Sequence, residues 1–329
     1  MCGVLTFYYF PRIYFQGGGA CWDKVSTEAG LCTTYSDPTS ADPGVFCRDN
    51  CPSTNPFSEY TIVQVLYCSG DAHVGNVVRD YSDSKGEAVT QMGAVNVQMT
   101  LDWIKSQTSY LTKFNELVLM GCSAGSLGVQ AWSHEVLSQM KASYGYDNAA
   151  VVPDSYAGVF PPGTQGQTIK GFGACTADAL NNAPELVELC NEGELTLQEM
   201  SDYAIDRNED VQFAFLNSKE DEVQIAYYVA IGATFPNTSA VITPEEYFID
   251  INVIFGGYAD KSNVVQVSCL RASEVAKKER LASERAVMLV SEALRSTGEE
   301  RAIRPLRSAF TNTYPLAAVL GGQRPALLH

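Results

Sequence analysis

The chain has 329 residues, of which 46% are hydrophobic, and this content is ample for a sizeable core in one large domain or two smaller ones. Its 22 basic and 38 acidic residues give a formal net charge of −16, a balance that repels polyanions and argues against a nucleic-acid partner. No run of about 18 apolar residues occurs, so no transmembrane segment is expected.

Short β-rich runs alternate with helical patterns, which predicts an α/β fold with a mostly parallel central sheet flanked by helices in a single domain. The predicted strands are Arg12–Gln16, Thr61–Tyr67, Glu116–Met120, Ala149–Pro153 and Val211–Asn217. From Glu87 to about Ser106, apolar residues recur every three to five positions. This spacing predicts a helix whose buried face is formed by Val89, Met92, Val95, Met99 and Ile104.

The charge is distributed unevenly. Residues 271–329 hold 10 Lys and Arg and 6 Glu, which leaves 12 basic and 32 acidic residues for residues 1–270. A helical pattern is expected from Arg271 to Ser296, and prolines and glycines follow it. The reversal of charge divides the chain into a body, residues 1–270, and a charged helical tail, residues 271–329, that we interpret as not native to the fold.

Ten cysteines are many for a cytosolic chain of this size, and they favour disulfides in an exported protein. Three short pairs stand out: Cys21 with Cys32, Cys47 with Cys51, and Cys175 with Cys190. Their spacing does not fix the connectivity, and reduced thiols are the alternative. Ligand spacing for a zinc site is lacking, so no metal and no cofactor are expected. The N-terminus has no evident signal peptide, and we expect its true start to be missing.

The strongest local signal is the pentapeptide Gly121-Cys122-Ser123-Ala124-Gly125, which follows an apolar strand and opens a helix from about Ser126 to Lys141. In a nucleophile elbow of this G-x-S-x-G type, the chain turns so sharply that the residues two before and two after the serine must lack side chains. The pattern therefore predicts Ser123 as a catalytic nucleophile.

A serine nucleophile needs donors for the oxyanion that forms on the substrate. One is expected from the residue after the nucleophile, the amide of Ala124, and others from an earlier loop. Three glycines follow the strand Arg12–Gln16 directly, so we expect the amides of Gly19 and Ala20 to point at the substrate oxygen. A flexible turn without function is the alternative. A phosphate-binding loop is a weaker alternative, because no Lys-Ser or Lys-Thr pair follows the glycines.

Three motifs in the same order, GGGACWD at Gly17–Asp23, YCSGD at Tyr67–Asp71 and GCSAGS at Gly121–Ser126, resemble the pectin acetylesterase/Notum family. The resemblance covers roughly residues 8–250. It implies an extracellular α/β-hydrolase domain, here residues 1–270, that removes acyl groups from hydroxyls. In one branch of the family the product is acetate from pectin, and in the other it is a fatty acid from a signalling protein.

The resemblance also implies which residue is the triad acid. The family pattern L-N-x-x-x-D-x-x-Q is matched by Leu216 to Gln224, which makes Asp221 the acid. A solvated acidic loop is the alternative interpretation, because Glu220 and Glu222 flank Asp221. Asp154 is a rival acid at the end of another predicted strand, and the resemblance implies that it supports the pocket instead.

No histidine lies where the family places the triad base, after a late strand that Asn263–Cys269 resembles. The whole sequence contains three histidines, His73, His134 and His329. His134 is expected to point away from the site, and His329 is the last residue of the tail. His73 is a candidate pocket residue, and a less favoured candidate for a substitute base.

The sequence thus predicts a secreted carboxylesterase that acts on an acylated saccharide or another ester, with its oligomeric state open. Two alternatives share the same residues. A pseudo-hydrolase would keep the pocket as a binding site without turnover, and an acyltransferase would differ only in its products.

Overall fold

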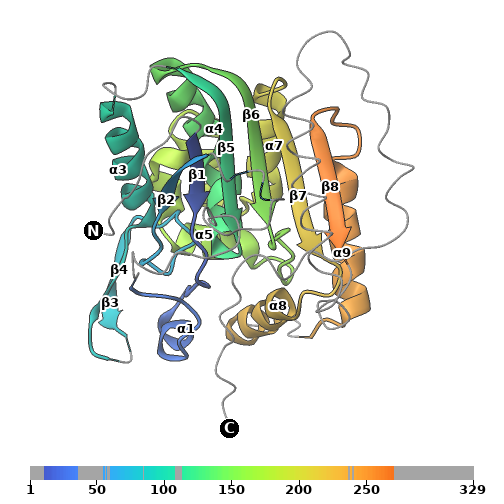
Figure 1. Ribbon diagram of the computed structural model, residues 1–329. Helices are drawn as coiled ribbons and strands as arrows, with labels where there is room; N and C mark the ends of the chain where they lie inside the picture. Colours follow the sequence, from blue (N-terminus) through green and yellow to red (C-terminus); the bar gives the residue numbers. More distant parts are fainter. Residues whose placement is uncertain are drawn as a thin grey trace.

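The computed structural model describes residues 11–35, 55, 57, 60–83, 85–107, 113–235, 238 and 241–269. Within this part of the chain, a six-stranded sheet with the order β2-β1-β5-β6-β7-β8 forms the centre (Figure 1). All of its neighbouring strands pair in parallel. Its strands are β1 Pro11–Phe15, β2 Thr61–Val65, β5 Phe114–Cys122, β6 Tyr146–Asp154, β7 Gln212–Ser218 and β8 Val264–Cys269. The predicted fold class is confirmed, and each predicted strand overlaps one of these.

The two faces of the sheet follow the alternation of side chains along each strand. One face, with Ile13, Leu119 and Phe213, joins a large apolar core with the helices. Val118, Val152 and Leu216 on the other face form a smaller cluster. The helices are α1 Lys24–Glu28, α3 Gly93–Ser106, α4 Ala124–Ser143, α5 Gln165–Gly171, α6 Pro184–Glu192, α7 Leu197–Arg207, α8 Glu222–Thr234 and α9 Pro244–Gly257, with 3-10 turns Ala174–Thr176 and Asp178–Leu180.

The predicted helix from Glu87 to Ser106 is partly wrong. It begins only at Gly93, because Ala88–Gln91 is strand β4, which pairs antiparallel with β3 Val77–Ser82. The predicted buried face is also wrong in its middle, since Val95 and Met99 are 37% and 46% exposed. The face of α3 that is buried comprises Ala94, Val97, Leu101 and Ile104, whose spacings of three and four residues match a helical turn.

Two predicted disulfides are present, Cys21–Cys32 and Cys175–Cys190, and Cys68 is also disulfide-bonded. The Cys47/Cys51 pair lies outside the described residues, as does the predicted tail, residues 271–329, with His329. No helix in the described segments is long and apolar enough to cross a membrane.

Parallel pairing brings the carboxyl ends of the strands to one edge of the sheet. Cys122 at the end of β5 lies beside Asp154 at the end of β6, and Ser218 on β7 lies beside Cys269 on β8. Helices α1 and α8 lie beyond this edge (Figure 1). In open α/β sheets, ligands bind at the carboxyl ends of the strands, so this edge is where a site is expected.

Candidate active site

Ser123 occupies a strained turn between β5 and α4. Its φ of 57° and ψ of −122° place a residue with a side chain in a region that favours glycine. A Cβ on Gly121 would overlap the carbonyl of Gly125, and one on Gly125 would overlap the carbonyl of Phe15. The two glycines of the motif are therefore required by close backbone contacts, as the elbow geometry predicts.

The Ser123 hydroxyl stays available at this turn. Ser123 is the N-cap residue of α4, yet its side chain makes no capping hydrogen bond, and the residue is only half-buried. Its N–H donates to the backbone carbonyl of Asp154 at 3.0 Å, which holds the turn against β6. The first turn of the 20-residue helix α4 contains no acidic residue, so its field favours negative charge beside Ser123.

The glycine-rich loop lies directly against the nucleophile. A Cβ on Gly17 would come within 2.5 Å of the Cys122 carbonyl oxygen and 3.3 Å of the Ser123 Cβ. Gly18 and Gly19 have φ angles of 157° and 71°, so the loop follows a path that side chains disfavour. The structure thus brings together two elements that the sequence analysis assigned to one site, the loop and the elbow.

The three candidate oxyanion donors are not equivalent. Ala124 is the first residue of α4, so its N–H has no intrahelical acceptor. The N–H of Ala20 donates to the hydroxyl of Tyr227 on α8, and this bond opposes the rise that burial causes in the pKa of Tyr227. Gly19 pairs with Cys32 in an isolated antiparallel bridge. The Ala20 amide thus hydrogen-bonds a side chain in this structure, whereas the Ala124 amide is not used within its own helix.

Asp221 follows β7 at the same edge and caps α8. Its Oδ1 accepts the N–H groups of Val223 and Gln224 at 3.0 Å each, and its Oδ2 accepts the Gln224 side-chain amide at 3.0 Å. The same amide donates to Asn217 Oδ1 at 2.8 Å. Burial raises the pKa of Asp221, and the bonds from Gln224 and Val223 oppose that rise. The Asn, Asp and Gln of the sequence motif therefore form one hydrogen-bonded unit.

Asp154 is a second carboxyl group at this edge and is only 2% exposed. Its Oδ1 accepts the Ser155 hydroxyl at 2.7 Å, whereas no hydrogen-bond partner for Oδ2 occurs among the described residues. Burial raises its pKa to about 7, the charge of Asp221 adds to the rise, and the bond from Ser155 opposes it. Asp154 is thus an acid that holds its proton up to near-neutral pH.

His73 lies beneath the glycine-rich loop and is 1% exposed. Its Nε2 is 2.8 Å from the carbonyl oxygen of Gln16, which can only accept, so Nε2 carries the proton. Burial lowers its pKa to about 4, and the bond to Gln16 opposes this. The ring therefore stays neutral at physiological pH and supports the loop from below.

His134 lies half-buried against α7, where its Nδ1 is 3.2 Å from the Asn208 side-chain amide and its ring contacts Tyr203 edge-on. It therefore belongs to the packing of α4 on α7. No group of three His, Cys, Asp or Glu side chains able to hold a metal ion occurs in the described ranges.

Two tyrosines of the site were missed by sequence reasoning. Tyr227 follows Gln224 by three residues on α8, so helical spacing from the motif glutamine is a signal that would have placed it near Asp221. Tyr67 is the first residue of the YCSGD motif, but the motif gives it no role. Its contact with Gly19 depends on the tertiary fold.

Comparisons with known proteins identify the family and the fold. The family model for pectinacetylesterase matches residues 12–239, which is more than half of the chain. Among solved structures, the Wnt deacylase Notum from Drosophila superposes with a TM-score of 0.54 at 17% sequence identity, over 81% of this chain and 78% of that chain. This structural likeness shows a shared fold. No match was found among curated proteins. The chain therefore belongs to the pectinacetylesterase family, a family of carboxylesterases with an α/β-hydrolase fold.

Proposed function

We propose that this protein hydrolyses a carboxylic ester through an acyl-enzyme formed on Ser123. The observation that carries the proposal is the conformation of Ser123, with a φ of 57° between two glycines and a hydroxyl not used as a helix cap. Such strain persists only where the surroundings hold it, and it exposes the serine oxygen at the start of a helix.

The chemistry has two steps. The Ser123 Oγ attacks the ester carbonyl, the serine proton passes through the base to the departing alcohol, and the acyl group remains on Ser123. Water then attacks the acyl-enzyme, which releases the carboxylic acid and returns the proton to Ser123. The amides of Gly19, Ala20 and Ala124 stabilise the oxyanion in both steps.

Asp221 orients the base in this proposal. It is a half-buried carboxylate that accepts three hydrogen bonds, at the edge where β7 and β8 end together. Both histidines within the described ranges are engaged elsewhere, His73 with Gln16 and His134 with Asn208. Neither of them is therefore assigned as the base that Asp221 would orient.

We propose that the ester is carried by an acylated saccharide outside the cell. The family name supports an acetyl ester, and the two disulfides are typical of an exported protein. The charge reversal at residue 270 supports the proposal that the tail, residues 271–329, does not belong to the hydrolase domain.

The test is acetate release from acetylated polysaccharides, measured for the wild-type chain and for Ser123→Ala. A fluorophosphonate probe, which reacts with activated serines, is applied to both proteins, and the labelled peptide is located by mass spectrometry. We expect acetate release and labelling at Ser123 in the wild type only. Equal acetate release by the two proteins would sink the proposal.

A pseudo-hydrolase is the second candidate, and the engagement of both described histidines favours it. It predicts that wild type and Ser123→Ala bind an acetylated oligosaccharide equally well while neither releases acetate. Product analysis separates hydrolysis from acyl transfer, because a transferase gives a new ester in place of free acetate.

A further inference from the structure

Two buried side chains from one turn hold the glycine-rich loop at two of its carbonyl groups. The Tyr67 hydroxyl donates to the Gly19 carbonyl at 2.8 Å, and His73 Nε2 donates to the Gln16 carbonyl at 2.8 Å. These two carbonyls flank the segment Gly17-Gly18-Gly19 that lies on the elbow. At both carbonyls the loop is held by a side chain, so these two side chains help to set the path of the loop backbone.

A fixed carbonyl also fixes an amide. In a trans peptide the C=O and the next N–H are coplanar and point in opposite directions. The bond from His73 to Gln16 therefore sets the direction of the Gly17 N–H. In the same way, the bond from Tyr67 to Gly19 sets the direction of the Ala20 N–H. The bond from the Thr33 N–H to the Gly18 carbonyl, at 2.7 Å, sets that of the Gly19 N–H.

The two side chains are themselves held in place. The N–H of Ala72 donates to the Tyr67 oxygen at 2.8 Å, which leaves the hydroxyl proton to point at Gly19. The rings of Tyr67 and His73 are in contact, with centroids 4.7 Å apart. Ala72 and His73 have φ angles of 54° and 65°, a strained turn after Tyr67 that brings the His73 ring against the Tyr67 ring.

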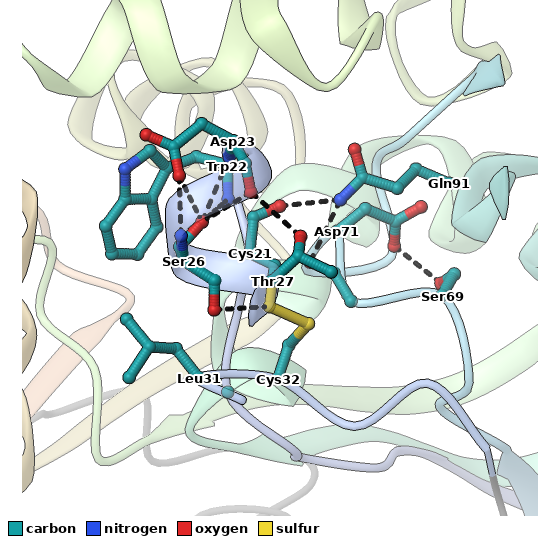
Figure 2. Close-up of a disulfide and its surroundings, with 12 residues drawn as sticks. Cys21, Trp22, Asp23, Ser26, Thr27, Leu31, Cys32, Ser69, Asp71 and Gln91 are labelled. Atoms are coloured by element: carbon teal, nitrogen blue, oxygen red, sulfur yellow. Dashed lines mark hydrogen bonds between the residues drawn. A yellow bond between two sulfur atoms is a disulfide. The ribbon is translucent and has the colours of Figure 1, made fainter. Parts of the chain in front are cut away.

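Further bonds anchor this turn to the rest of the fold. Asp71 accepts the N–H of His73 at 3.1 Å and that of Gly93 at 2.7 Å, and the Trp132 indole on α4 donates to the His73 carbonyl at 2.9 Å. Beyond the glycines, the loop is fixed by the Cys21–Cys32 disulfide and by the Gln91 amide, which donates to the Cys21 carbonyl at 2.6 Å (Figure 2). The turn thus links the loop to α3 and α4.

We propose that Tyr67 and His73 are positioning residues of the oxyanion hole: Tyr67 holds the peptide plane that carries the Ala20 amide, and His73 holds the peptide plane at which the glycine-rich loop begins. Their role rests on the proposed esterase function, since only there do the loop amides stabilise an oxyanion. Donors that are oriented before the substrate arrives require no reorganisation when negative charge develops, and such donors contribute large rate factors. Neither side chain needs to touch the substrate.

The test compares Tyr67→Phe with Tyr144→Phe. Each substitution removes a buried tyrosine hydroxyl that donates to a main-chain carbonyl, since Tyr144 donates to Ile104 at 2.5 Å, away from the loop. For His73 the pair is His73→Gln, whose amide can still donate to Gln16, and His73→Leu, which cannot. Amide hydrogen exchange of residues 17–20 is measured in every protein, together with kcat and KM for 4-nitrophenyl acetate.

We expect Tyr67→Phe and His73→Leu to speed exchange of the loop amides at least about 10-fold and to lower kcat by roughly 10- to 100-fold, with KM changed less than about twofold. Tyr144→Phe is expected to leave both unchanged, and His73→Gln to restore most of the loss. Loop exchange in Tyr67→Phe equal to that in Tyr144→Phe would overturn the proposal.

Exchange needs no turnover, so the two failures are distinguishable. If the wild type shows no turnover above Ser123→Ala while Tyr67→Phe still frees the loop, the esterase function fails and the structural role of Tyr67 stands. If the wild type turns over and the loop is unaffected, the positioning role alone fails.

Discussion

The two halves of the candidate site are built very differently. In the nucleophile half, formed by the glycine-rich loop and the elbow, close backbone contacts and hydrogen bonds fix the chain at Gly17, Gly19 and Ser123. In the acid half, the buried carboxyl group of Asp154 lies near that of the half-buried Asp221, and one oxygen of Asp154 has no partner among the described residues. The nucleophile half is therefore fixed by its own backbone contacts, whereas the acid half contains a carboxyl group that is not fully hydrogen-bonded within the described residues.

This difference indicates that a proton or a cationic group is needed beside the two carboxyl groups. Two nearby carboxylates cannot both stay ionised at low cost in a buried environment, so one retains a proton or a cationic partner must approach. The acid half lies where β7 and β8 end, on the side from which the family's base would arrive. Substitutions are therefore expected to have opposite effects on stability at two positions: destabilising at the glycines of the elbow and stabilising at Asp154.

The largest effect is expected for Gly125→Ala, which breaks the nucleophile half. The new Cβ would overlap the Phe15 carbonyl, and a backbone atom of a central strand cannot move aside cheaply. We expect a loss of more than about 4 kcal/mol in the free energy of unfolding, measured by urea denaturation.

The matched control is Gly256→Ala on α9, where nothing lies within 4 Å of the added Cβ. This variant should gain about 0.5–1 kcal/mol, because alanine is a better helix former than glycine. Equal stability of the two variants would contradict the close packing of the elbow.

The next largest effect is expected in the acid half, on the pH dependence of stability in Asp154→Asn. The pKa of Asp154 is about 7 in the folded protein against an ordinary value of 3.8. The folded state therefore binds this proton more tightly than the unfolded state, so the stability of the wild type falls as pH rises from about 4 to 7. The neutral variant lacks this loss.

We expect Asp154→Asn to match the wild type at pH 4 and to exceed it by about 3 kcal/mol at pH 8, since one pKa unit corresponds to about 1.4 kcal/mol and the amide still lacks a full set of partners. Urea unfolding at both pH values measures the difference. A variant less stable than the wild type at pH 8 would show that the ionised carboxylate has a partner.

The smallest effect on stability is expected at Asp221, where capping and charge are separable. Asp221→Ala removes the cap of α8 and should cost about 1 kcal/mol, whereas Asp221→Asn keeps an acceptor for Val223 and Gln224 and should cost only a few tenths. Both variants should lose esterase activity to a similar extent, because each lacks the charge that orients the base. Full activity in Asp221→Asn would remove Asp221 from the catalytic machinery.

The sequence predicted the nucleophile half better than the acid half for a physical reason. Glycines in tight turns leave a local pattern, so the loop and the elbow were visible beside their strands. The proximity of Asp154 and Asp221 depends on the pairing of β6 with β7, which no local pattern encodes. The role of His73 was equally hidden, because its contact with Gln16 spans 57 residues.

Errors in the fold have similar causes. Val95 and Met99 fit a loose apolar stripe, yet Ala94 and Val97 face the core. Neighbouring positions on a helix differ by about 100° in direction, so an error of one position in the stripe selects a different face. The helices α5 to α7 went unpredicted, since they are short and the packing of α7 against α4 is a tertiary effect.

The central claim, that Ser123 is the nucleophile of an esterase, is tested most directly by turnover of 4-nitrophenyl acetate at pH 7 by the wild-type chain and by Ser123→Ala. We expect repeated turnover by the wild type and a rate at least about 1000-fold lower, near the buffer background, for the variant. Turnover by Ser123→Ala at the wild-type rate would show that Ser123 is not the nucleophile.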